Sequence, residues 1–95
     1  MTQAQEEEFR RFLEGLETHG KHLTEKAINS RIAKAKKAEQ VSNMDIEKIV
    51  ASDATMRRVL INLRPGDTRG NRANAVRKYY EMRRGKVFPK IRDAE

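Results

Sequence analysis

Apolar residues in this chain recur at the three- and four-residue spacings of a helix face, and no segment alternates as a half-buried strand would. This helical spacing is found over residues 9–16, 28–35, 46–50, 56–63 and 73–83. Periodicity of this kind is typical of helices that each bury one stripe against their neighbours. The sequence therefore predicts an all-α fold, a compact bundle of four to five helices that forms a single domain over residues 1–95.

Capping signals place the first two helices. Residues 4–18 are expected to form an acidic first helix within the segment 1–20, ended by Gly20 or frayed earlier by Gly15. The second helix is expected to begin after Thr24, whose hydroxyl group can accept a hydrogen bond from the first turn. Its apolar face continues to about Glu39.

The C-terminal half predicts three further helices and a tail. They are a short helix from Ser42 or Asp45, a helix capped by Ser52 or Asp53, and, after a turn over residues 64–67, a helix from about Asn71 to Arg84. Gly85 is well placed to end the last helix. The apolar run Val87-Phe88-Pro89 is expected to fold back onto the bundle, so that residues 86–95 form a partly anchored tail.

The charge of the chain is concentrated in two segments. The formal net charge is +7. Residues 21–40 carry six basic and two acidic side chains, and residues 64–95 carry ten and four, whereas residues 1–20 carry two and five. Such segregation is expected of a surface that binds a polyanion, although a generically basic helical protein would share the composition.

The candidate DNA contacts lie on the outer faces of two helices. On the second helix they fall within an arc of about 80° opposite the apolar residues, and on the last helix they lie opposite or flank them. They are Lys26, Ser30, Lys34, Lys37, Asn71, Asn74, Arg77 and Lys78. Lys and Arg neutralise phosphates, and Asn can pair with adenine, so this combination favours duplex DNA as the partner. The alternative is an ordinary solvated helix face.

No catalytic or metal site emerges from the remaining residues. Tyr79 and Tyr80 could serve as nucleophiles or stack on bases, but their helical positions favour burial. His19 and His22 are spaced for a shared metal ion, yet no cysteine and no second ligand pair accompanies them. We therefore expect no enzymatic activity and no cofactor.

Cysteine content and hydropathy suggest where the protein resides. The chain has no cysteine, no apolar run approaching the roughly 18 residues of a membrane span, and an acidic N-terminal segment. These features predict a soluble, cytoplasmic protein without a membrane partner.

Three segments resemble the core-binding domain of phage integrases and other tyrosine recombinases. Residues 74–82, read as small-aliphatic-basic-basic-aromatic-aromatic, resemble its closing helix, which precedes the catalytic domain. The stretch from Leu23-Thr24 through Ala38 is similar to the second helix, and that from Asp45 to Val50 is similar to the linking helix. The resemblance implies a SAM-like bundle that forms half of a clamp around DNA during recombination and integration. It assigns DNA contact to the second and last helices.

The chain departs from this family in its details. Arg31 stands where an aromatic residue is common, and Ala35 and Ala38 stand where larger apolar residues are usual. The family's cleavage chemistry belongs to a separate domain with its own tyrosine nucleophile, so the resemblance implies DNA binding without catalysis. The implied partners are duplex DNA and a catalytic domain or homologous protein. The alternative function is a helical protein-interaction or regulatory module that uses the acidic first helix.

Overall fold

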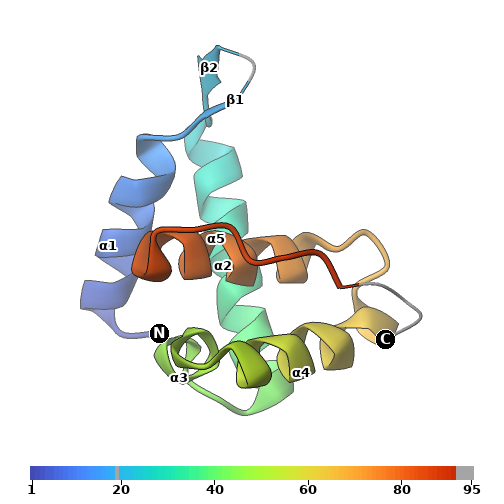
Figure 1. Cartoon of the computed structure of the whole chain (residues 1–95). Coiled ribbons are helices and arrows are strands. Elements are labelled where there is room, and N and C mark those ends of the chain that lie inside the picture. The colour runs from blue at the N-terminus through green and yellow to red at the C-terminus, as the bar shows by residue number, and fades with distance from the viewer. Residues whose placement is uncertain (19, 92–95) are drawn as a thin grey trace.

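A computed structural model describes residues 1–18 and 20–91 of the chain. Within these residues the protein forms five α-helices, a short 3₁₀ turn and a two-stranded hairpin (Figure 1). The elements are α1 (Gln3–Glu14), β1 (Glu17–Thr18), β2 (Lys21–His22), α2 (Glu25–Ser42), α3 (Ile46–Ala51), α4 (Asp53–Leu63), η1 (Arg64–Gly66) and α5 (Asn71–Arg84). The prediction of an all-α bundle is confirmed, while the SAM-like arrangement and the single-domain boundary stay predictions.

The first helix is shorter than the predicted range 4–18. α1 ends at Glu14, and the N–H of Gly15 donates to the carbonyl of Arg11 at 3.2 Å. The chain then turns into an antiparallel hairpin in which β1 pairs with β2, with Gly20 at a φ of +77°. No pattern in the sequence indicated this hairpin, because a two-residue strand is too short to produce an alternating apolar pattern. The hairpin projects beyond the helices at the top of Figure 1.

Short polar side chains begin the next three helices. The Oγ1 atom of Thr24 accepts from the N–H of Ala27 at 3.1 Å, which confirms Thr24 as the cap of α2. Of the alternatives left open by the sequence, Asp45 caps α3 and Ser52 caps α4. Helix starts were therefore encoded locally, by side chains that satisfy the unpaired N–H groups of the first turn.

Left-handed residues end the two longest helices. α2 runs past the expected Glu39 to Ser42 and stops where Asn43 takes a φ of 53°. α5 ends as predicted at Gly85, whose φ is 69° and whose N–H donates to the carbonyl of Glu81 at 2.9 Å. The error at the end of α2 reflects Asn43, which can adopt this conformation without being glycine.

α5 crosses α2 near the middle of the molecule, with α1 on one side and with α3 and α4 below in Figure 1. Tyr79 and Tyr80 on α5 are fully buried, as their helical positions predicted. Tyr79 packs edge-on against Phe9 of α1 with ring centroids 5.2 Å apart, and Tyr80 packs in the same way against Phe88 at 5.1 Å. The aromatic residues therefore connect α5 to both ends of the chain.

The segment after α5 folds back over the bundle, as expected, with Phe88 in the core and Ile91 partly buried against it. Phe88 is 7% exposed, whereas Val87 is 71% exposed. The predicted tail, residues 86–95, is thus anchored at Phe88, and residues 92–95 lie outside the described residues. No helix in residues 1–18 and 20–91 is both long and apolar enough to span a membrane.

Candidate nucleic-acid interface

The outer face of α2 carries the first group of predicted contacts. Lys26, Ser30 and Lys37 are exposed, and Lys34 is half-buried at the side that approaches α5. Small residues at the helix interface bring the two helices close, since Ala35 on α2 and Ala75 on α5 are fully buried. Lys34 is therefore positioned by the crossing of the two helices rather than by α2 alone.

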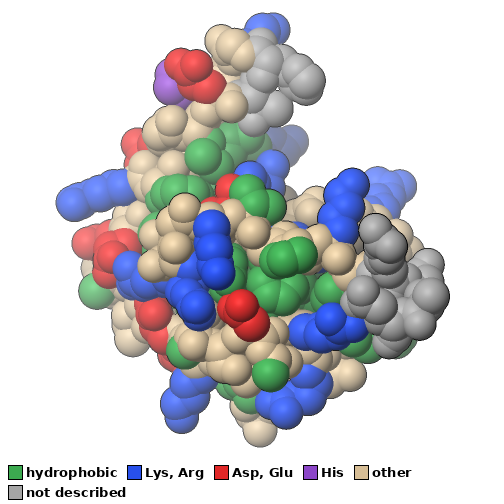
Figure 2. All heavy atoms as spheres, in the orientation of Figure 1, with side chains coloured by type: hydrophobic (Ala, Val, Ile, Leu, Met, Phe, Trp, Pro, Cys, Tyr) green, Lys and Arg blue, Asp and Glu red, His purple; other side chains and the backbone are tan. Residues whose placement is uncertain are grey.

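A hollow of about 220 Å³ lies between α2 and α5. The residues that line it are Ala27, Ser30, Arg31, Lys34, Asn71 and Asn74. Of the predicted DNA contacts, the structure thus brings together Ser30 and Lys34 of α2 with Asn71 and Asn74 of α5. The outline of the molecule in Figure 2 is notched between the hairpin end of α2 and the N-terminal half of α5, with Lys and Arg side chains bordering the notch.

Three other predicted contacts extend this surface along the two helices. Lys26 lies one turn before Ser30, and Lys37 lies one turn after Lys34, both on the exposed side of α2. Lys78 lies one turn after Asn74 on α5, with its Nζ atom 3.1 Å from Oε2 of Glu81. They do not line the hollow but flank it.

Arg77 takes a different position from the one predicted. Its Nη1 atom donates to the carbonyl oxygens of Phe88 and Pro89, at 2.9 and 3.3 Å, and its guanidinium group lies 5.7 Å from the centroid of the Phe88 ring. Burial lowers the pKa of Arg77, an effect that the nearby Glu81 partly offsets. Arg77 therefore fastens the C-terminal segment, and the structure does not place it in the hollow.

Arg31 lines the hollow although the sequence did not identify it as a contact. Its side chain is half-buried between α2 and α5. On a helical wheel it lies about 60° from Lys34, toward the core, at a position where the resembled family commonly has an aromatic residue. The sequence did contain a signal for this contact, namely an arginine beside the apolar stripe of the helix. Such a side chain can bury its aliphatic part and keep its charged end at the edge of the helix interface.

Carboxylates are paired elsewhere in the molecule. Arg83 of α5 binds both Glu8 of α1 and Glu47 of α3, through N–O distances of 2.6 and 2.7 Å. Lys36 pairs with Glu6 at 3.1 Å. These contacts hold helices together and neutralise acidic residues away from the hollow. The surface charge therefore differs between the two sides of α2.

In the part of the chain that the structure describes, the two cations that line the hollow and the two lysines that flank it on α2 have no such partners, whereas Lys78 on α5 pairs with Glu81. Within residues 1–18 and 20–91, none of Lys26, Arg31, Lys34 and Lys37 forms an ion pair. No acidic side chain among these residues pairs with them to offset their mutual electrostatic repulsion, which is reduced by solvent and by any anion that binds there. An arrangement of this kind favours a polyanion over a neutral ligand.

The N-terminus of α5, next to the hollow, already holds an anion. The carboxylate of Asp67 accepts hydrogen bonds from the N–H groups of Arg72 and Ala73, at 3.0 and 2.9 Å. Two of the first-turn amides that could bind a phosphate in other helices are therefore occupied. The donors that the hollow offers are side chains.

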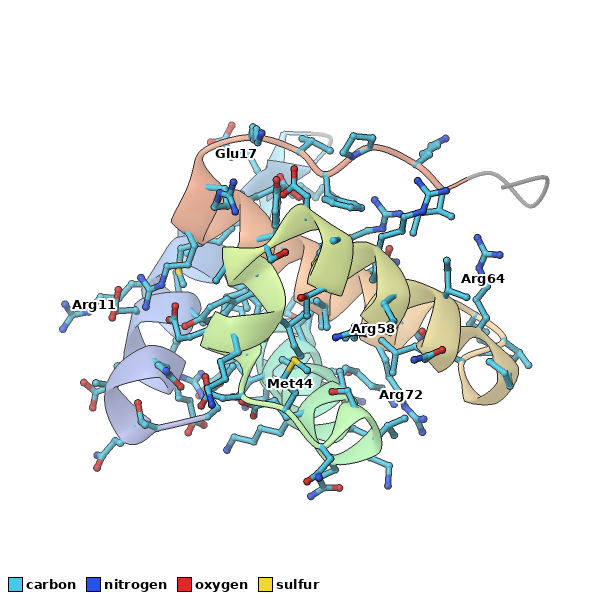
Figure 3. The ribbon with its side chains drawn as sticks, turned by 60° about the horizontal axis from the view of Figure 1, so that its bottom comes forward. Arg11, Glu17, Met44, Arg58, Arg64 and Arg72 are labelled. Atoms are coloured by element: carbon cyan, nitrogen blue, oxygen red, sulfur yellow. The ribbon has the colours of Figure 1, made fainter. Side chains whose placement is uncertain are left out.

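Further cations lie at the end of the molecule where α4 runs into η1 and α5 begins. Figure 3 shows Arg64 of η1 at this end, with Arg72 of α5 and Arg58 of α4 closer to the middle of the view. Arg64 donates to the carbonyl of Ile91 at 3.3 Å, so it also fastens the C-terminal segment. Arg72 directly follows Asn71 and extends the basic character of this end of α5.

The side chains considered for other chemistry lie in unsuitable settings. The hydroxyl group of Tyr79 donates to the carboxylate of Glu47, and burial raises the pKa of this tyrosine far above its usual value. A nucleophilic role or base stacking by this ring is therefore disfavoured. Among the described residues, no three His, Cys, Asp or Glu side chains are grouped to hold a metal ion, and His19 lies outside the described residues.

Comparison of the chain with protein-family models, with curated proteins and with solved structures gives no match. The resemblance to recombinase core-binding domains therefore rests on the sequence segments quoted above and stays a prediction.

Proposed function

We propose that this protein is a DNA-binding module that grips duplex DNA mainly through its phosphates, along the surface formed by α2 and α5. The observation that carries the proposal is the hollow between these helices, where Arg31 and Lys34 lie beside Asn71 and Asn74 without an acidic neighbour in its lining. The proposed activity is binding alone, with no catalytic step. A role in recombination or integration is part of the proposal only through the family resemblance.

The physical basis is electrostatic. Duplex DNA carries a dense line of phosphates with condensed counterions, and each cation that replaces a counterion contributes favourable entropy. The exposed Lys26 and Lys37 extend the cationic surface along α2 on either side of the hollow. The amides of Asn71 and Asn74 can add a modest base preference, because an asparagine can pair with adenine in the major groove.

The test is a titration of a labelled duplex with the protein at low and at moderate salt concentration. The expected result is binding whose affinity falls steeply with salt, with a log–log slope that reports the number of phosphates neutralised. Absence of binding at low salt would overturn the proposal and leave a protein-interaction or regulatory module as the alternative. Binding that is insensitive to salt would exclude the phosphate mechanism.

A further inference from the structure

The hollow between α2 and α5 has the donor set of a site for a phosphate group. Its volume of 220 Å³ is below the roughly 300–1,000 Å³ of sites that enclose whole drug-sized ligands. The polar side chains in its lining are a hydroxyl, two amides, an ammonium and a guanidinium group. All of them can donate hydrogen bonds, and no carboxylate lines the hollow.

The two cations of this lining lie where an anion would be held most firmly. Arg31 and Lys34 are half-buried, so solvent screens their charges less than it screens those of Lys26 and Lys37. Neither has an ion-pair partner within the described residues. Partial burial removes water that would otherwise hydrate these two charges. An anion in the hollow would replace that water with direct contacts to both side chains.

We propose that the hollow seats one phosphate of the DNA backbone, an inference that rests on the DNA-binding function proposed above. Arg31 supplies two parallel N–H donors from its guanidinium group, and Lys34 supplies a point charge. Asn71 and Asn74 donate from the opposite wall, on α5. The carboxylate of Asp67 already occupies the N–H groups of Arg72 and Ala73 at the α5 N-terminus, and the donors proposed for the phosphate are side chains.

The first experiment replaces Arg31 by Lys, which keeps the charge and removes the forked pair of donors. A seated phosphate predicts that Arg31→Lys weakens duplex binding about tenfold while the salt slope stays unchanged. The matched control is Lys48→Arg, at an exposed position on α3 outside both the hollow and the proposed surface, which should bind within about twofold of the unmodified protein. Far-ultraviolet circular dichroism of both variants checks that the helices are intact.

If the unmodified protein binds DNA and Arg31→Lys binds equally well, the seat is wrong although the proposed function stands. If the unmodified protein does not bind DNA, a titration with inorganic phosphate tests whether the hollow binds phosphate at all. The NMR signals of the Asn71 and Asn74 side-chain amides are monitored during this titration. Saturable shifts with phosphate but not with chloride at equal ionic strength would support a seat for a phosphate from another source. No shift in that case would overturn the seat together with the function.

Discussion

Lys34 on α2 and Asn74 on α5 line the same hollow, although α3, α4 and η1 lie between them in the sequence. Their proximity depends on one helix crossing, which the buried residues of α5 hold in place. Changes at the hollow should therefore affect DNA binding without affecting stability, and changes in the buried layer should affect stability first.

Reversing one charge at the hollow should reduce DNA affinity selectively. Lys34→Glu is expected to weaken duplex binding by more than about tenfold, because it removes one phosphate contact and adds repulsion. The control is Lys48→Glu on α3, an exposed lysine outside the lining of the hollow, which changes the net charge equally. Fluorescence anisotropy at fixed salt measures both affinities. The free energy of unfolding of both variants should stay within about 0.5 kcal/mol of that of the unmodified protein, as is usual for surface substitutions.

Arg77 and its neighbour Lys78 should show opposite effects when each is replaced by methionine. Arg77→Met removes hydrogen bonds to the carbonyls of Phe88 and Pro89, and should reduce the free energy of unfolding by about 1–2 kcal/mol. Lys78→Met removes the same charge and should reduce DNA affinity more and stability less. Urea unfolding and duplex titration of both variants provide the comparison. The reverse order of effects would restore Arg77 as a DNA contact.

Tyr80 should contribute to stability through both its ring and its hydroxyl group. Its ring is fully buried against Phe88, and its hydroxyl donates to Oδ1 of Asp53 at 2.8 Å. Tyr80→Ala is expected to destabilise the protein by about 3–5 kcal/mol, and Tyr80→Phe by about 1 kcal/mol. Urea denaturation measures both changes. A Tyr80→Ala variant that remains fully stable but no longer binds DNA would contradict the buried role.

The ion pair between Glu8 and Arg83 should make stability depend on pH. The hydrogen bond from Arg83 holds the pKa of Glu8 below its ordinary value of 4.5, against a smaller opposing effect of burial. A lowered pKa in the folded state stabilises the protein above pH 4.5, and this contribution is lost as the pH falls through the folded-state pKa.

The measurement is urea unfolding of the unmodified protein and of Glu8→Gln, at neutral pH and near pH 3. The unmodified protein should be the more stable at neutral pH, and the difference should shrink at low pH and in high salt. A difference that does not change with pH would show that the pair contributes nothing through its charge.

Much of the local structure followed from short stretches of sequence. Thr24 and Gly85 were assigned their capping roles from the sequence because a cap depends on the residue itself and its immediate neighbours. The hairpin around Gly20 was missed for the complementary reason that two-residue strands carry no periodic signal. The end of α2 was missed because asparagine, at Asn43, ends helices less often than glycine does.

Part of the candidate site could likewise be predicted from the sequence, and part of it depended on the tertiary structure. Helical periodicity alone determined that Lys34 and Asn74 point away from the core, since the apolar stripe of each helix fixes the opposite face. Only the tertiary structure decided that the two residues meet, that Arg31 joins them and that Arg77 binds the C-terminal segment instead. The crossing of α5 over α2 depends on how all the buried side chains pack together, and no local pattern encodes which distant surfaces that packing will join.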